Sequence, residues 1–261
     1  MSKHNRIILL NYNATCQIRI FEHLSWNPML EICYQDPYLV AINKPHGLLV
    51  HRSRIAEESS EFALQMLRDQ LGTRVYPTHR IDRKTSGVLL FALQKEVEIS
   101  MQKQFQENLV KKKYLCVLRG YADDFGRIDY PLAKDNGVLQ DSLTHYQTIA
   151  RAELEVPLGK FPTSRYSLVV ASPQTGRMHQ LRKHFAHIFH PIIGDRKHGC
   201  NKQNRLFTER WQMNTMLLHA GSLGFIHPIT KEEIHIKATP HQEYLNVLNL
   251  MGWSQYADLN A

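Results

Sequence analysis

The sequence lacks the long apolar run that a membrane-spanning helix requires. None of its apolar stretches approaches about 18 residues. Lys3 and Arg6 precede a short apolar segment at 7–10, but this segment is too short for a secretory signal peptide. Hydrophobic residues make up 43% of the 261 residues and charged residues 21%, which is ordinary for a globular protein of one large domain or two modest ones.

Cysteine is also scarce. The four cysteines, at positions 16, 33, 116 and 200, lie far apart and form no C-x-x-C pair. A zinc ribbon or a dithiol redox motif is therefore not indicated. Reduced thiols of this kind fit a protein of the cytoplasm.

Motifs of several large enzyme classes are missing. The sequence contains no G-x-G-x-x-G, G-x-x-x-x-G-K-[ST], H-E-x-x-H or G-x-S-x-G. Dinucleotide-dependent enzymes, P-loop ATPases, zinc proteases of this type and α/β hydrolases are therefore poor candidates.

What the chain has in excess is positive charge. Its 32 Lys and Arg against 24 Asp and Glu give a formal charge of +8. The window 177–210 holds eight Lys or Arg against Asp195 and Glu209, together with five histidines. Such a basic window is typical of a nucleic-acid contact, although a solvated protein face is the commoner fate of surface charge.

Hydrophobic periodicity predicts more strands than helices, without βα alternation. This pattern favours an α+β fold with a mixed, largely antiparallel sheet. The expected strands are 30–34, 39–43, 88–92, 115–118, 144–154, 165–171, 216–225 and 233–236, and the expected helices are 62–71, 95–109, 178–189 and 243–250. Residues 121–142 are expected to form a surface excursion, and 195–212 a polar, basic segment.

Two helices carry an expected buried stripe. The inward candidates, which recur at roughly helical spacing, are Val97, Ile99, Met101, Phe105 and Leu109 in one helix and Met178, Leu181, Phe185 and Ile188 in the other.

The stretch 79–92, HRIDRKTSGVLLFA, joins a charged loop to an apolar strand. Its carboxylate, Asp82, lies among His79, Arg80 and Arg83. A nearby cation stabilises an ionised carboxylate, which can then act as a nucleophile or a base. The simpler interpretation is that Asp82 caps the turn through the Thr85 or Ser86 amide.

A second constellation lies at 176–195. If this segment is helical, His179 and Arg182 lie three residues apart on one face, where the arginine is able to bind a carboxylate or phosphate. His184, His187 and His190 have a spacing that suggests zinc, but no acidic or cysteine ligand accompanies them. RNA contacts or plain packing are the better interpretation of these three histidines.

Taken together, these motifs resemble the RluA-type pseudouridine synthases. HRIDRKTSG at 79–87 matches the family signature H-R-L-D-x-x-T-S-G, with Ile81 in place of leucine. Lys112-x-Tyr114 matches a second motif, and GRMHQLR at 176–182 a third. Shorter matching segments lie at 43–47, 190–195, 218–220 and 227–228, so the resemblance covers about 29–250. It implies a pseudouridine-synthase-like catalytic domain with a central cleft.

The resemblance also implies roles. Asp82 would be the catalytic aspartate, attacking at ribose C1′ or acting through a ribose-centred elimination. Tyr114 would pack on the uracil and help to remove its C5 proton, and Arg182 would pair with Asp82. Arg80 would fill the gap left by a flipped base or hold a phosphate. The further expected RNA contacts are His79, Arg83, Lys112, Arg177, His179, Lys183 and Lys197. The reaction is an isomerisation, so no cofactor and no metal are expected.

Within the family, the chain is similar to members that modify uridine 65 in the T stem of tRNA. This similarity rests on segments 50–53, 161–166 and 197–199. Two alternatives remain open, the same chemistry on ribosomal RNA and a non-catalytic RNA-binding module. The expected partner is tRNA, for a monomer without a membrane or a required protein partner.

Residues 1–28 do not resemble the rest of the chain. They are too short for the N-terminal S4 domain that related enzymes often carry, and they lack its basic helices. We expect 1–28 to be a disordered leader or an upstream stretch that is not normally translated, and 29–261 to be the catalytic domain.

Overall fold

The computed structural model of the protein describes residues 29–51 and 61–257. The predicted leader at 1–28 lies outside the described residues, as do Arg52 and Ser53 of the segment 50–53. No described helix has the length and apolar character to cross a membrane.

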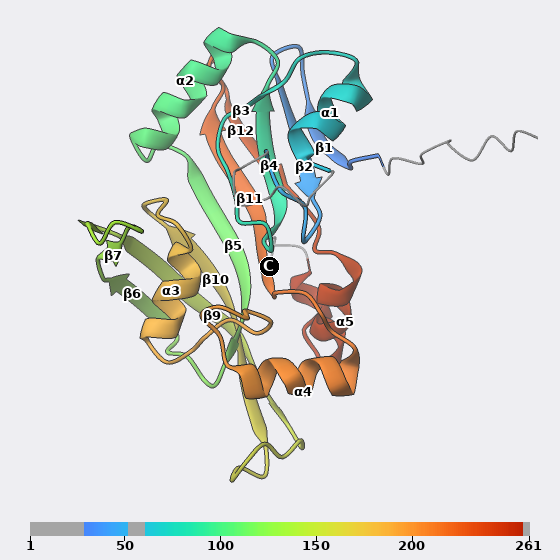
Figure 1. Cartoon of the computed structure of the whole chain (residues 1–261), viewed down its shortest axis with the longest axis vertical. Coiled ribbons are helices and arrows are strands. Elements are labelled where there is room, and N and C mark those ends of the chain that lie inside the picture. Colours follow the sequence, from blue (N-terminus) through green and yellow to red (C-terminus); the bar gives the residue numbers. More distant parts are fainter. Residues whose placement is uncertain (1–28, 52–60, 258–261) are drawn as a thin grey trace, which may run out of the picture.

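One long twisted sheet runs along the molecule (Figure 1). Its strands follow the order β1-β2-β4-β11-β5-β10-β9-β6, with β12 paired to β11 and β3 to β4. Their bounds are β1 Ile32–Gln35, β2 Leu39–Lys44, β3 Tyr76–Pro77, β4 Ser86–Ala92, β5 Lys111–Arg119, β6 Phe125–Asp129, β9 Leu143–Leu154, β10 Ser164–Pro173, β11 Leu218–Ile226 and β12 Glu233–Lys237. Within the described sheet only β4 and β11 pair in parallel. The predicted α+β fold with a largely antiparallel sheet is confirmed.

The helices cover both faces of the sheet (Figure 1). They are α1 Ala63–Leu71, α2 Lys95–Gln106, α3 Gln180–His187, α4 Asn201–Trp211 and α5 Gln242–Leu250, followed by a short 3-10 turn Ser254–Tyr256. Alternate residues of β5 point to opposite faces. Leu115 and Val117 pack with α4 and α5, whereas Cys116 and Leu118 pack with α3. The sheet is therefore buried on both sides of this strand.

The start of β4 fits closely against β11. His219 and Ala220 lie opposite Ser86 and Gly87 in the parallel pairing. Gly87 has φ of +108°, and a Cβ there would lie 2.2 Å from the Ala220 carbonyl oxygen, so no larger residue fits. His219 accepts a hydrogen bond from Ser86 at 2.9 Å. The loop that carries Asp82 is thus fixed at its C-terminal end.

Several expectations about individual segments were wrong. Ile99 and Leu109 are 58% and 60% exposed. Ile99 lies two residues from the buried Val97, which places it on the opposite side of the helix, and α2 ends before Leu109. Met178 is 43% exposed because α3 begins only at Gln180.

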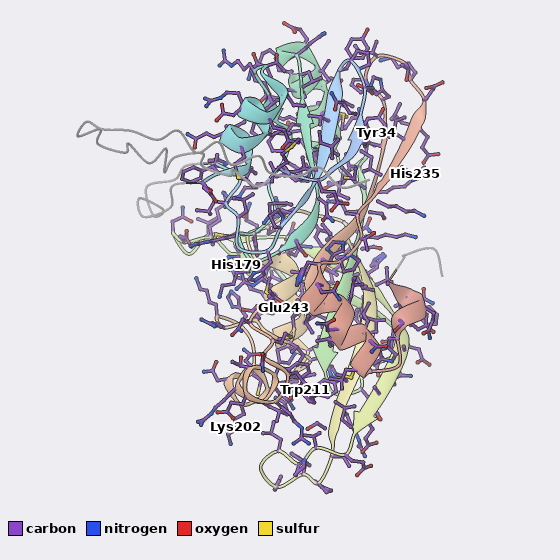
Figure 2. All side chains as sticks on the ribbon, turned by 90° about the vertical axis from the view of Figure 1, so that its right-hand side faces the viewer. Tyr34, His179, Lys202, Trp211, His235 and Glu243 are labelled. Atoms are coloured by element: carbon purple, nitrogen blue, oxygen red, sulfur yellow. The ribbon has the colours of Figure 1, made fainter. Side chains whose placement is uncertain are left out.

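Two segments hold more regular structure than the sequence indicated. The segment 121–142 contains β6, which pairs with β9, and a two-stranded hairpin of β7 Leu132–Ala133 and β8 Leu139–Gln140. The basic segment 195–212 contains the helix α4, which inserts the buried Phe207 into the core. Figure 2 shows Lys202 of α4 pointing away from the protein.

Candidate active site

A cleft of about 450 Å³ opens beside the central strands. Its size falls within the range of roughly 300–1,000 Å³ that small organic ligands occupy. Residues from the loop before β4, from α2, from β5 and from the start of α3 line it. Asp82, Tyr114 and Arg182 all face this cleft, although Arg182 lies 100 positions from Asp82 in the chain.

Asp82 lies in the loop between β3 and β4, with its side chain 22% exposed. The turn that follows is closed by the Thr85 N–H, which donates to the backbone carbonyl of Asp82 at 3.0 Å. Lys44, fully buried, donates to the Arg83 carbonyl at 3.1 Å. The backbone therefore forms this turn, and the Asp82 carboxylate is left to face the cleft. The interpretation that the Asp82 side chain caps the turn is therefore wrong.

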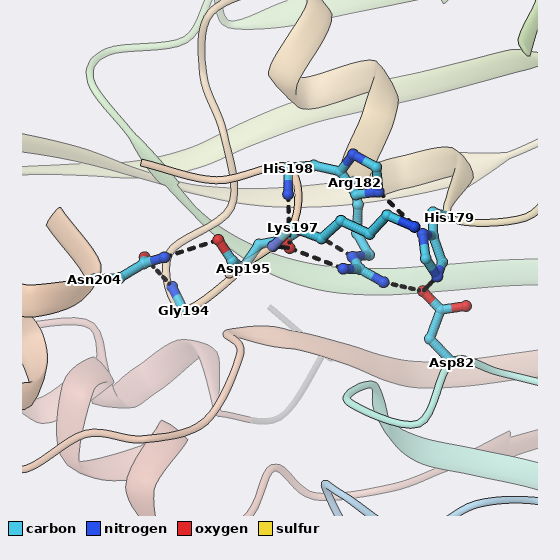
Figure 3. Close-up of polar contacts among 8 residues, drawn as sticks. All are labelled: Asp82, His179, Arg182, Gly194, Asp195, Lys197, His198 and Asn204. Carbon is cyan, nitrogen blue, oxygen red and sulfur yellow. Dashed lines mark hydrogen bonds and ion pairs between the residues drawn. The ribbon is translucent and has the colours of Figure 1, made fainter. Parts of the chain in front are cut away.

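Arg182 is held on one edge by Asp195. Its Nε and Nη2 donate to the two carboxylate oxygens at 2.7 and 2.8 Å, while Nη1 donates to Asp82 Oδ2 at 3.0 Å (Figure 3). The side chains of Arg182 and Asp195 are only 7% and 1% exposed. A bidentate pair of this kind fixes the plane of the guanidinium. Arg182 is thus aimed at Asp82 by a second carboxylate.

Asp195 is the site residue that sequence reasoning missed. Burial by itself raises the pKa of this carboxyl, but the Arg182 guanidinium and the backbone N–H groups of Lys197 and His198 outweigh burial and hold the pKa below its ordinary value. The signal in the sequence was the place of Asp195 at the end of the segment 190–195, which matches the family. Nothing local showed that Asp195 would reach Arg182.

Tyr114 lies on β5 at the junction between two core clusters and lines the cleft. Burial, and then the negative charge of Asp82, raise the pKa of its phenol well above the ordinary value. The side chain therefore remains a neutral phenol at physiological pH. It offers a flat apolar surface next to the carboxylate.

The structure brings most of the predicted RNA contacts into the cleft, and some of them have structural partners there. His79 stacks on Phe105 with ring centres 4.5 Å apart, accepts the Leu90 N–H, and has its pKa lowered by burial to about 3. It is a neutral histidine in the cleft lining. Arg80 is exposed at the rim, and burial lowers the pKa of Lys112 on the cleft wall.

Two further predicted contacts also line the cleft. Arg177 donates through Nε to the Asp141 carbonyl at 3.0 Å. His179 precedes α3 with a left-handed backbone, φ 56°, and its Nε2 lies 3.9 Å from Asp82 Oδ2. Both residues therefore belong to the wall opposite the Asp82 loop.

Three predicted contacts lie outside the cleft lining. Arg83 donates to the Gly47 carbonyl at 2.9 Å, and Lys183 to the Ala133 carbonyl at 3.3 Å. Lys197 follows Asp195 on the surface. Arg83 and Lys183 thus make backbone contacts away from the cleft lining, whereas the charge of Lys197 lies close enough to His179 to lower the pKa of that histidine.

The three histidines spaced by three have protein partners in the structure. His184 is fully buried and hydrogen-bonded to Ser142 and Thr144 at 2.9 and 3.0 Å. His187 stacks on Tyr130, with ring centres 3.7 Å apart. Across 29–51 and 61–257, no group of three or more His, Cys, Asp or Glu side chains is placed to hold a metal ion. Packing is the role that the structure gives to His184.

Comparison with known proteins gives the family. Residues 38–187, more than half of the chain, match the RNA pseudouridylate synthase family. The chain belongs to this family. It is 47% identical over 243 residues to tRNA pseudouridine synthase C of Pasteurella multocida, covering 89% of this chain and 98% of the relative. It is 43% identical over 244 residues to tRNA pseudouridine synthase C of Vibrio cholerae, covering 89% of this chain and all of the relative.

Solved structures agree with this assignment. Human RNA Pseudouridylate Synthase Domain Containing 1 matches with a TM-score of 0.64 at 25% identity, over 81% of this chain and 83% of that one. Human RNA Pseudouridylate Synthase Domain Containing 4 has the same fold, with a TM-score of 0.66 at 23% identity over 85% of this chain and 93% of that one. The predicted membership of the pseudouridine synthases is confirmed, and the chain is an isomerase of this family.

Proposed function

We propose that the protein isomerises uridine to pseudouridine in tRNA, at position 65 of the T stem, with Asp82 as the catalytic residue. The observation that carries the proposal is the Asp82 carboxylate in the cleft, paired with the fixed guanidinium of Arg182. The choice of tRNA rests on relatives named tRNA pseudouridine synthase C that are 43–47% identical over most of the chain.

The reaction needs a carboxylate that is free to reach the ribose. Arg182 engages Oδ2 of Asp82, and no protein donor to Oδ1 is found in the described part of the chain. Oδ1 is therefore the oxygen that attacks C1′, or that takes a ribose proton if the reaction proceeds by elimination. The C1′–N1 bond breaks, the uracil turns, and C5 bonds to C1′ as the Oδ1–C1′ bond breaks or, after elimination, as the ribose proton returns. The C5 proton then leaves while N1 gains one. No electrons are exchanged, so the chemistry itself requires no redox cofactor.

Tyr114 serves in this scheme as the surface on which the uracil turns. Its raised phenol pKa disfavours the phenolate form, so packing accounts for its position better than removal of the C5 proton. An aromatic ring tolerates several orientations of a stacked base, which the rotation requires.

The uridine must leave its helix to reach the cleft. Unstacking and unpairing a base costs about a few kcal/mol, which contacts to the flanking RNA have to offset. In this proposal Arg80, which is exposed and lines the cleft, occupies the vacated position or holds a phosphate. Lys112, Arg177 and His179 contact the flipped nucleotide. Arg83, Lys183 and Lys197 contact the flanking RNA backbone.

We further propose that residues 29–261 form one catalytic domain that acts as a monomer in the cytoplasm. The four buried clusters all pack on the same sheet, which supports a single domain. Size-exclusion chromatography with light scattering would test the monomer, and a dimer mass would contradict it.

The test compares the protein with its Asp82→Asn variant on three RNAs labelled at uridine C5 with tritium. These are a tRNA with uridine at position 65, the same tRNA with cytidine there, and ribosomal RNA. We expect tritium release only from the first RNA and only with the unmodified protein, while the variant still binds that tRNA. Release from ribosomal RNA alone would replace the proposed substrate. Binding without release from any RNA would favour a non-catalytic RNA-binding module.

A further inference from the structure

A second histidine lies behind His179, on the side away from Asp82. His198, in the turn before α4, has its Nε2 3.0 Å from Nδ1 of His179. The other nitrogen of His179, Nε2, lies 3.9 Å from Oδ2 of Asp82. Figure 3 shows the three side chains in a row, from the turn after Asp195 to the cleft. His179 lines the cleft, whereas His198 is not among its lining residues.

The backbone at both histidines is held by specific local structure. His179 has a left-handed conformation, with φ of 56°, which is uncommon for a residue other than glycine and is found where surrounding contacts enforce it. It precedes α3 without making a side-chain capping bond, so its ring is free for another purpose. The backbone N–H of His198 donates to Asp195 Oδ1 at 3.1 Å. The carboxylate that orients Arg182 therefore also places His198.

Charges of both signs surround the two rings. Arg182 and Lys197 contribute positive charge, and Asp82 and Asp195 negative charge. Burial lowers the pKa of His198 to about 4 and also lowers the pKa of His179, against the opposing effect of the carboxylates. Both imidazoles are therefore neutral near pH 7. A neutral imidazole has one N–H and one acceptor nitrogen, so a single proton lies between the two rings.

The position of that proton decides what His179 presents to Asp82. If His179 donates to His198, the Nε2 of His179 carries a lone pair that faces the negative Oδ2. If His198 donates to His179, the Nε2 of His179 carries the proton and directs an N–H at Oδ2. The second arrangement replaces a repulsion with an attraction, and so electrostatics selects it.

We propose that His198 is a positioning residue, which donates its Nε2–H to Nδ1 of His179 and so fixes the tautomer of His179 that points an N–H at Asp82. This inference rests on the proposed function, because it assigns a purpose to the orientation of the Asp82 carboxylate. Arg182 and His179 then share Oδ2, and rotation of the carboxylate is opposed from two directions. Oδ1 remains directed at the substrate, and no proton is transferred.

The 3.9 Å separation is longer than a hydrogen bond. Catalytic hydrogen bonds are often long without substrate and shorten when the complex forms. His179 is thus poised to close on Asp82 when the nucleotide fills the cleft. Because the contact matters most in the bound state, losing it lowers kcat more than it raises KM.

Two variants of His198 test the proposal. His198→Gln retains an amide N–H near the place of Nε2–H, whereas His198→Phe keeps a planar ring without any donor. We expect His198→Phe to lower kcat about tenfold with KM nearly unchanged, as when the partner that orients a catalytic group is lost. His198→Gln should stay within about threefold of the original kcat. His235→Phe, at an exposed position on β12, is the control for exchanging histidine for phenylalanine.

Nitrogen NMR of histidine-labelled protein gives a readout independent of activity. The His179 signals, assigned from their loss in His179→Gln, should show a protonated Nε2 and an unprotonated Nδ1. A proton on Nδ1, or an unchanged kcat in a folded His198→Phe variant, would overturn the proposal. Thermal melting establishes that each variant is folded. If the unmodified protein forms no pseudouridine, the proposed function fails, while the NMR result still decides the tautomer.

Discussion

On one wall of the cleft Asp82 is held through its backbone, whereas on the other wall Arg182 is held through its side chain. The Asp82 turn is closed by main-chain groups and by Lys44, and it continues directly into the buried strand β4. Arg182 depends instead on a buried ionised partner, Asp195. The backbone-held wall therefore tolerates a change of its reactive side chain. The wall held by ion pairs does not tolerate the loss of either charge.

Among variants that keep the Asp82 carboxylate, the largest expected effect comes from Arg182→Lys. Lysine keeps the charge but cannot donate to Asp195 twice and to Asp82 at the same time. We expect kcat to fall about 100- to 1,000-fold, as when one fixed donor at a reacting charge is lost. Steady-state assays of pseudouridine formation measure this. Arg205→Lys, which changes an exposed pair with Glu209 on α4, is the matched control, and an equal loss there would contradict the account.

Asp195→Asn should lower the free energy of unfolding more than Asp82→Asn does, because the two walls are held differently. Removing one charge of a buried pair is expected to lower the free energy of unfolding by about 3 kcal/mol. Asp82→Asn, at a partly exposed site whose turn is closed by the backbone, should lower it by about 1 kcal/mol or less. Urea denaturation at pH 7 compares the two variants. Equal losses would remove the distinction between the walls.

The buried ion pair of Arg182 and Asp195 also predicts that the free energy of unfolding depends on pH. The pKa of Asp195 is lowered in the folded protein from its ordinary value of 3.8. Its stabilising contribution is therefore complete above that value and is lost as the pH falls through the lower, folded value. In unfolding curves, the difference in stability between the original protein and Asp195→Asn should be constant from pH 6 to about the ordinary value of 3.8 and should shrink as the pH falls further, through the folded pKa. A difference that stays constant at the lower pH as well would contradict this assignment.

A smaller effect is expected at Tyr114. If the ring serves by packing, Tyr114→Phe should keep kcat within about threefold, and Tyr114→Leu should lower it about tenfold, in keeping with roughly 1–3 kcal/mol for a base stacked on an aromatic ring. Single-turnover measurements separate the chemical step from product release. A loss of 100-fold or more in Tyr114→Phe would instead give the hydroxyl a direct part in proton removal.

The smallest effect concerns the surface beyond the cleft. If Lys183 contacts a phosphate, Lys183→Gln should reduce the slope of log binding constant against log salt by about 1. Lys160→Gln, in the loop between β9 and β10, should leave the slope unchanged. Filter binding of tRNA at several salt concentrations provides both slopes. A flat salt response of the original protein would argue against the basic window as the docking surface.

Local patterns in the sequence predicted much of the fold. The apolar run 88–92 forms β4, and the helix that follows Phe62 ends at Gly72, which has the left-handed conformation expected of such a stop. These features depend on neighbours within a few residues. The helix α4 escaped notice because its only large apolar residue in full contact with the core is Phe207, so no apolar stripe marks it.

The site was predictable only in part. Asp82, Tyr114 and Arg182 were singled out through family motifs, and the cleft brings all three together, while their roles remain predictions. Asp195 and His198 were not assigned, because their partners, Arg182 and His179, lie 13 and 19 positions away across a turn. Such contacts depend on how α3 packs against the sheet. Hydrophobic periodicity does not encode them.

Pseudouridine mapping in cells tests the central claim most directly. Cells whose only copy of this chain is the original or Asp82→Asn would supply tRNA and ribosomal RNA for mapping at single positions. We predict pseudouridine at position 65 of tRNA with the original chain and uridine there with the variant, with all other positions unchanged. Retention of pseudouridine at position 65 in the variant, or a change confined to ribosomal RNA, would contradict the account.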